Sequence, residues 1–149
     1  MKALLIIAPQ NFRDEELFNT KEELEKARVE VTVASSKTGT IKGMLGGAAK
    51  ATVELSRVKV EDYDVVVFIG GSGASVYYEN PLVHQIARKA AQAGKLLAAI
   101  CIAPGILAKA GVLKGKKATI WNGDFIKILE GNGAKYTGKA VEIDGKIIT

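Results

Sequence analysis

The chain has 149 residues, of which 48% are hydrophobic and 25% are charged, and its formal net charge is +5. This length is enough for one domain with a single core, and the lone cysteine excludes an internal disulfide and a multi-cysteine zinc site. Basic residues are scattered, with one cluster at 114–117, so nothing indicates the basic stripe of a nucleic-acid reader.

We expect neither a signal peptide nor a membrane-spanning segment. The apolar run at residues 3–8 is too short for a signal peptide, and no run approaches membrane-spanning length. We therefore expect a cytoplasmic protein with a single domain over residues 1–149 and with neither a membrane nor a nucleic acid as partner.

The first third of the chain predicts a strand, a helix and further strands. The aliphatic run at 3–8 indicates a strand buried on both faces, and Asp14 is a plausible N-cap for a helix that extends to Arg28. Three more strands are expected from alternation and from β-branched residues. They cover residues 29–34, near a sheet edge, and a pair around 41–44 and 51–54.

The central third repeats this rhythm. Residues 65–69 predict a buried strand that runs into the turn Gly70 to Gly73, and a helix capped by Asn80 is ended by Gly94. The only histidine, His84, lies on the polar face of this helix, so we interpret it as a solvated surface residue. A second buried strand covers residues 96–101.

The last third predicts shorter elements. They are a helix from Pro104 to Gly111, a strand at 118–121, a helix at 124–130 and a hairpin around Asp144-Gly145. Together the elements predict an α/β fold, a mostly parallel sheet with helices on both faces.

The functional site of such a sheet lies at the carboxyl ends of its strands. Three features converge there: the acidic pair Glu15 and Glu16 after the first strand, the turn Gly70 to Gly73, and Cys101. Glycines let backbone N–H groups approach a developing oxyanion closely. The sequence therefore predicts a site around these residues.

Cys101 falls on a strand-to-helix turn, where free N–H groups and the helix dipole favour a thiolate. A lone cysteine in an apolar run is also commonly a small buried hydrophobe. A neighbouring ionised glutamate would raise the pKa of the thiol, whereas a protonated one would donate a hydrogen bond to sulfur and lower that pKa.

Five segments carry a resemblance that spans the chain in order. They are Phe12-Arg-Asp-Glu-Glu-Leu-Phe18, Phe68-Ile-Gly-Gly71, Ala98-Ala-Ile-Cys-Ile-Ala-Pro104, Ala110-Gly-Val-Leu-Lys-Gly-Lys116 and the Asp144-Gly145 hairpin. These segments resemble the ThiJ/PfpI superfamily, which includes the parkinsonism-associated deglycase, bacterial chaperone-like relatives and archaeal intracellular proteases.

The resemblance implies a flavodoxin-like three-layer sandwich that forms a homodimer or a higher oligomer and needs no cofactor or metal. It implies that Cys101 is the nucleophile and that Glu16, rather than Glu15, is the acid beside it. The Gly70-Gly71 turn and Ile102 would supply the backbone N–H groups of an oxyanion pocket.

The sequence also departs from the family pattern. Ile102 and Trp121 stand where the protease-like and deglycase branches have a histidine, and Ser75 stands where the protease-like branch has an acid from a neighbouring subunit. A Cys-His pair is therefore missing within the chain, which disfavours peptide hydrolysis. Family members also continue past the final strand into a closing helix, so either the sequence is shortened or one sheet face is bare and needs a partner chain.

Three functional hypotheses follow. The first is glyoxalase or deglycase chemistry on reactive aldehydes or their glycated adducts, using Cys101 and Glu16. The second is a non-enzymatic redox sensor or chaperone-like stress protein. The third, a flavodoxin-like binding module, is disfavoured because the turn at 9–13 lacks a Ser/Thr-rich phosphate cradle. A cysteine peptidase is a remote alternative that would require a histidine from another subunit.

Overall fold

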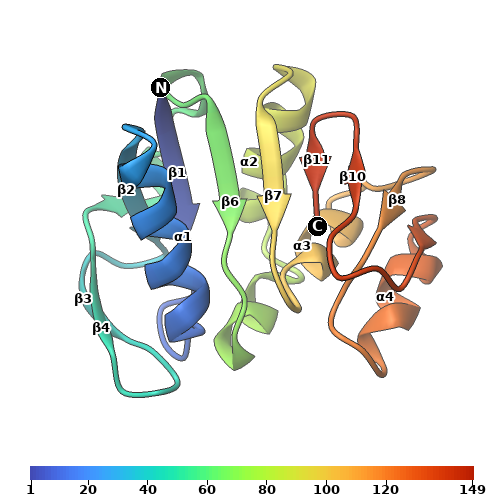
Figure 1. The fold of residues 1–149 in the computed structure, drawn as a ribbon, viewed down its shortest axis with the longest axis horizontal. Coiled ribbons are helices and arrows are strands. Elements are labelled where there is room, and N and C mark those ends of the chain that lie inside the picture. Colours follow the sequence, from blue (N-terminus) through green and yellow to red (C-terminus); the bar gives the residue numbers. More distant parts are fainter.

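A seven-stranded sheet forms the centre of the computed structural model, which describes all 149 residues (Figure 1). The strand order is β10-β11-β7-β6-β1-β2-β5. Every neighbouring pair is parallel except the terminal hairpin β10-β11. The prediction of a mostly parallel α/β sheet is confirmed.

The main strands are β1 (Lys2–Ile6), β2 (Glu30–Ser35), β5 (Val53–Glu54), β6 (Val65–Phe68), β7 (Leu96–Ala99), β10 (Ile143–Asp144) and β11 (Ile147–Ile148). The α-helices are α1 (Asp14–Lys26), α2 (Pro81–Gln92), α3 (Pro104–Lys109) and α4 (Phe125–Gly131). Three short 3-10 helices are η1 (Leu55–Arg57), η2 (Val60–Asp62) and η3 (Ser72–Tyr77).

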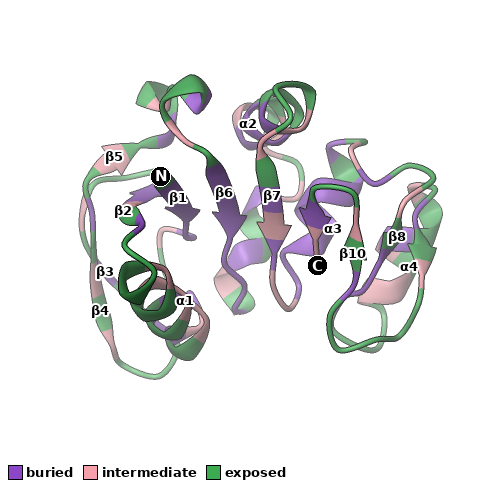
Figure 2. Ribbon diagram, turned by 45° about the horizontal axis from the view of Figure 1, so that its top comes forward, coloured by how far each residue is buried: buried purple, intermediate pink, exposed green.

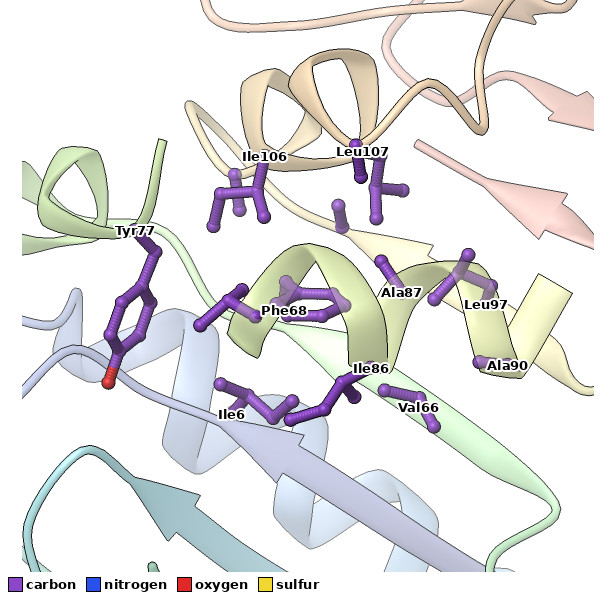
Figure 3. Close-up of a cluster of buried hydrophobic side chains, with 14 of the residues drawn as sticks. Ile6, Val66, Phe68, Tyr77, Ile86, Ala87, Ala90, Leu97, Ile106 and Leu107 are labelled. Atoms are coloured by element: carbon purple, nitrogen blue, oxygen red, sulfur yellow. The ribbon is translucent and has the colours of Figure 1, made fainter. Parts of the chain in front are cut away.

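The sheet is packed on both faces, because successive residues of a strand point to opposite sides. On one face, Ile6 of β1 and Phe68 of β6 pack with Ile86 of α2 and Ile106 of α3 in the larger core (Figure 3). On the other face, Leu5 belongs to a smaller core that includes residues of α1. The continuous aliphatic run of the first strand is explained by this double burial.

Part of the second face has no helix over it. Helix α1 covers the β1 side, whereas the strands β7, β11 and β10 are left open (Figures 1 and 2). Here Leu96 and Ile143 are 37% and 63% exposed, and Ala98 and Ile148 are half-buried. The sequence analysis named a bare sheet face as one of two possibilities. The structure has such a face over β7, β11 and β10.

The strand pair after β2 differs from the prediction. Strand β3 (Gly39–Lys42) pairs with β4 (Ala48–Ala51), while β5 extends the main sheet beside β2. The turn between β3 and β4 comes earlier in the chain than expected, and Asp14 fixes it. The Asp14 carboxylate accepts hydrogen bonds from the N–H groups of Leu45 and Gly47, at 2.9 and 2.7 Å. Asp14 is accordingly not the N-cap of α1, a position that Arg13 occupies.

The region after α3 also differs. The strand expected at 118–121 is reduced to β8 (Lys117–Ala118), which pairs with β9 (Lys135–Tyr136) in a separate small sheet. The end of the expected strand bonds to the Cys101 turn and not to a neighbouring strand. The N–H of Trp121 donates to the Cys101 carbonyl at 2.8 Å. The hairpin at Asp144-Gly145 is confirmed.

The second long helix is confirmed, but the interpretation of its histidine is wrong. Asn80 caps α2 by accepting hydrogen bonds from the N–H groups of Leu82 and Val83. His84 is half-buried rather than solvated, and its Nε2 lies 2.7 Å from the carbonyl oxygen of Tyr78. The connection between η3 and α2 lies against the imidazole ring, so His84 is less exposed than its helix face predicts.

A buried tyrosine ties η3 to the strand ends. The Tyr77 hydroxyl donates to the Ile7 carbonyl at 2.8 Å and accepts from the Ser36 N–H at 3.0 Å, and Tyr77 is only 2% exposed. We expect Tyr77→Phe to lower the free energy of unfolding by about 1–3 kcal/mol, because buried partners lose their hydrogen bonds.

Urea denaturation measures this effect. Tyr63→Phe is the matched control, since Tyr63 is half-buried at the sheet's opposite end, and we expect a change within about 0.5 kcal/mol. Equal stabilities for the two variants would contradict the role assigned to the Tyr77 hydroxyl.

Candidate active site

Cys101 lies on a strained turn between β7 and α3. Its φ is +61°, a left-handed conformation that non-glycine residues rarely adopt. Hydrogen bonds hold both sides of the turn, from the Ile100 N–H to the Phe68 carbonyl and from the Trp121 N–H to the Cys101 carbonyl. Such strain costs about 1–3 kcal/mol and concentrates at functional positions.

Glu16, in the first turn of α1, reaches the same point. Its Oε2 accepts a hydrogen bond from the Gly70 N–H at 2.8 Å. A Cβ on Gly70 would lie 2.6 Å from that oxygen and 2.7 Å from the Cβ of Cys101. The missing side chain at position 70 therefore lets the carboxyl and the thiol meet.

The other carboxylate of the acidic pair points elsewhere. Glu15 accepts two hydrogen bonds from the Arg13 guanidinium, at 2.8 and 3.0 Å. The geometry thus separates Glu15 from Glu16, a distinction that composition and spacing left open.

Two backbone N–H groups face the sulfur, those of Gly71 and Ile102. Gly71 has a φ of +104°, and the Arg13 N–H donates to the Gly70 carbonyl at 2.9 Å, which fixes the turn. The N–H of Gly70 is already taken by Glu16, so this residue orients the acid rather than offering a donor to a ligand.

Burial raises the pKa values of both Glu16 and Cys101. Burial raises the pKa of Glu16, and the Gly70 hydrogen bond only partly opposes this rise. Burial, and then the negative charge of Glu16, raises the pKa of Cys101, against the influence of the Gly71 and Ile102 N–H groups. Burial thus outweighs the thiolate stabilisation that the turn alone predicts.

Two cavities of about 660 and 410 Å³ meet at Cys101. Glu16, Cys101 and Trp121 line both of them. The larger cavity extends over the bare strands β7 and β11, and the smaller one is bounded by Arg13 and Phe125. Cys101 itself is half-buried.

The remaining polar residues do not complete a metal site or a Cys-His pair. No group of three or more His, Cys, Asp or Glu side chains is arranged to hold a metal ion. His84 lies on α2 and lines neither cavity. Ser75 is exposed and its hydroxyl donates to the Ser72 carbonyl at 3.3 Å.

Sequence reasoning placed Tyr78 near the Cys101 crevice but gave it no hydrogen-bonding role. Its hydroxyl donates to the Ile102 carbonyl at 2.7 Å, which steadies the turn from beneath, and burial raises the pKa of this phenol. Gly105 is the one available signal, because a Cβ there would lie 2.7 Å from the Tyr78 ring.

A parallel α/β sheet with a cysteine on a strained strand-to-helix turn defines the nucleophile-elbow class of protein. Within that class, the chain belongs to the DJ-1/PfpI family, whose model matches residues 1–149. No helix of the structure is both long and apolar enough to span a membrane.

Relatives and solved structures agree with this assignment. A deglycase of Pyrococcus horikoshii is 34% identical over 149 residues, covering 100% of this chain and 89% of the relative. A glutathione-independent glyoxalase of Caenorhabditis elegans is 29% identical over 147 residues, covering 99% and 78%. The crystal structure of a ThiJ/PfpI domain protein from Brachyspira murdochii superposes with a TM-score of 0.96 at 28% identity, covering 99% and 84%.

The raised pKa of Glu16 predicts how stability depends on pH. A carboxyl whose pKa is higher in the folded state stabilises the fold below its unfolded pKa, and this contribution is lost as the pH rises through the folded pKa. The free energy of unfolding of the wild type, relative to Glu16→Gln, should therefore fall as the pH is raised from 4.5 toward neutrality.

Urea titrations at several pH values test this. Glu22→Gln is the control, because the Lys26 ion pair lowers the pKa of Glu22 and predicts the opposite sign. A wild-type advantage over Glu16→Gln that grows with pH would contradict the assignment.

Proposed function

We propose that this protein acts on reactive 2-oxoaldehydes, or on their adducts with proteins, by glyoxalase or deglycase chemistry. The observation that carries the proposal is the contact between Glu16 and the Gly70 N–H, which holds a carboxyl of raised pKa against the Cys101 thiol. Relatives named deglycase and glyoxalase support the same chemistry.

The reaction begins with addition of the Cys101 sulfur to the aldehyde carbon. A hemithioacetal forms, and its oxygen, negative during attack, receives N–H donation from Gly71 and Ile102 before it takes the thiol proton. The influence of both N–H groups on the pKa of the Cys101 thiol supports this role, because it places them beside the sulfur.

Glu16 then moves a proton within the adduct. Its carboxylate takes the proton from the former aldehyde carbon and returns it to the neighbouring carbon. The hydroxyl proton of the hemithioacetal passes to the oxygen of that neighbouring carbon, and the product is a 2-hydroxy thioester. Water cleaves this thioester to a 2-hydroxy acid and restores the thiol. The chemistry needs a general base that ionises near working pH, and the raised pKa of Glu16 suits that role.

Peptide hydrolysis is a weaker proposal. Expulsion of an amine requires a general acid close to the leaving group, usually a histidine paired with the cysteine. Trp121 lines both cavities beside Cys101, and His84 lines neither. A reaction that releases no amine from an amide bond fits this site better.

Substitution of the two central residues tests the proposal. We expect Cys101→Ala to abolish formation of lactate from methylglyoxal, and Glu16→Gln to lower kcat/KM by about 10²- to 10⁴-fold, the usual contribution of a general base. Glu23→Gln, an exposed carboxylate on the same helix, should leave the rate unchanged.

A second candidate function shares the thiol. Cys101 is half-exposed and faced by two N–H groups that suit the oxygens of a sulfinate, which favours redox sensing by a stress protein. Absence of lactate at any enzyme concentration, together with addition of oxygen to Cys101 by mild peroxide, would reject the enzyme and favour the sensor.

We also infer that the chain forms a homo-oligomer through its bare sheet face. The exposed apolar side chains of Leu96, Val141 and Ile143 support this, since such clusters mark interaction surfaces. Ile143→Asp should shift the mass measured by analytical ultracentrifugation from a multiple of the chain mass to that of one chain. Val76→Asp, at an exposed valine of η3, is the control; a monomeric wild type would refute the inference.

A further inference from the structure

Arg13 is the only arginine or lysine that lines the smaller cavity beside Cys101. Its backbone is fixed at the N-terminus of α1, where its N–H donates to the Gly70 carbonyl at 2.9 Å. The residue is therefore anchored to the same turn that aligns Glu16. Neither the proposed chemistry nor the fold requires a cation at this position.

The guanidinium is held in one orientation by Glu15. Its Nε and Nη2 donate to the two carboxylate oxygens of Glu15, at 2.8 and 3.0 Å. This side-on pairing uses two of the five N–H donors of the group. The end-on edge, formed by Nη1 and the second N–H of Nη2, is left for another planar anion, and the side chain is 41% exposed.

The other residues around the smaller cavity complement such an anion. Glu16 is the only acid among them, and it is half-buried, bound to Gly70 and of raised pKa, so it competes weakly for Arg13. Met44, Trp121 and Phe125 provide apolar wall. The cavity thus combines the Cys101 thiol, an apolar wall and one cation oriented by Glu15.

We propose that the end-on edge of Arg13 binds a carboxylate of the substrate, so that the preferred substrates are 2-oxoaldehydes that carry a carboxylate at the far end of a short chain. The substrate preference rests on the proposed function, whereas the anion site itself does not. Arg13 is then a specificity-determining residue: it holds the substrate while Cys101 and Glu16 perform the chemistry.

A matched pair of substrates measures the preference. In 4,5-dioxopentanoate a carboxylate replaces the terminal methyl group of 2-oxopentanal, and the two molecules share the same reacting end. We expect the wild type to favour the anion by about 10- to 100-fold in kcat/KM, mainly through KM, as one charge-assisted hydrogen-bonded pair would give.

Variants at position 13 test whether Arg13 causes the preference for the anionic substrate. Arg13→Met should bring the ratio of the two kcat/KM values close to 1, and Arg13→Lys should retain only part of it, because an ammonium lacks the planar fork. Arg57→Met removes an exposed arginine of η1 and should keep the wild-type ratio. A ratio that survives in Arg13→Met, or a wild type without preference, would overturn the inference.

A binding readout separates this inference from the proposed reaction. The unreactive acid 4-oxopentanoate should protect Cys101 from iodoacetamide at about tenfold lower concentration than 2-pentanone, and Arg13→Met should abolish that difference. Protection without turnover of either aldehyde would reject the proposed function and keep the anion site. Equal protection by the two compounds in the wild type would reject the anion site, whatever the turnover.

Discussion

The close approach of three chain segments at Gly70 is the constraint on which the site depends. The N–H of this residue binds the Glu16 carboxyl, its carbonyl accepts the Arg13 N–H, and its missing Cβ admits Cys101. Any side chain at position 70 would push the acid and the thiol apart. The helix start, the glycine turn and the elbow are consequently one unit, and each element of the parallel sheet behind them serves to bring their ends together.

Burial sets the chemistry of this unit more strongly than the local turn does. The elbow offers N–H groups to a thiolate, yet removal of the thiol and the carboxyl from water raises the pKa of each, and their charges repel. Burial therefore favours the protonated form of both Cys101 and Glu16. Such a pair suits a reaction in which a nucleophile is unmasked and a proton is then carried between adjacent carbons.

The same geometry explains how neighbouring acids take different roles. Glu15 and Glu16 are adjacent in the sequence, but one residue along a helix rotates the side chain by about 100°. Glu16 consequently faces the elbow and is partly desolvated, whereas Glu15 remains near solvent and orients the guanidinium of Arg13. The start of one helix thus brings a half-buried carboxyl and an arginine to a single cavity.

The sequence by itself determined the parallel sheet and the placement of Cys101 at an elbow, because apolar runs, the Asn80 cap and Pro104 are local signals. It misassigned Asp14 and the strand at 118–121, and it did not assign the hydrogen bond of Tyr78, because their partners are distant in the chain. The positive φ of Cys101 and the proton balance at the site were decided only by tertiary structure. Both depend on long-range packing and on exclusion of water, which no local pattern of residues encodes.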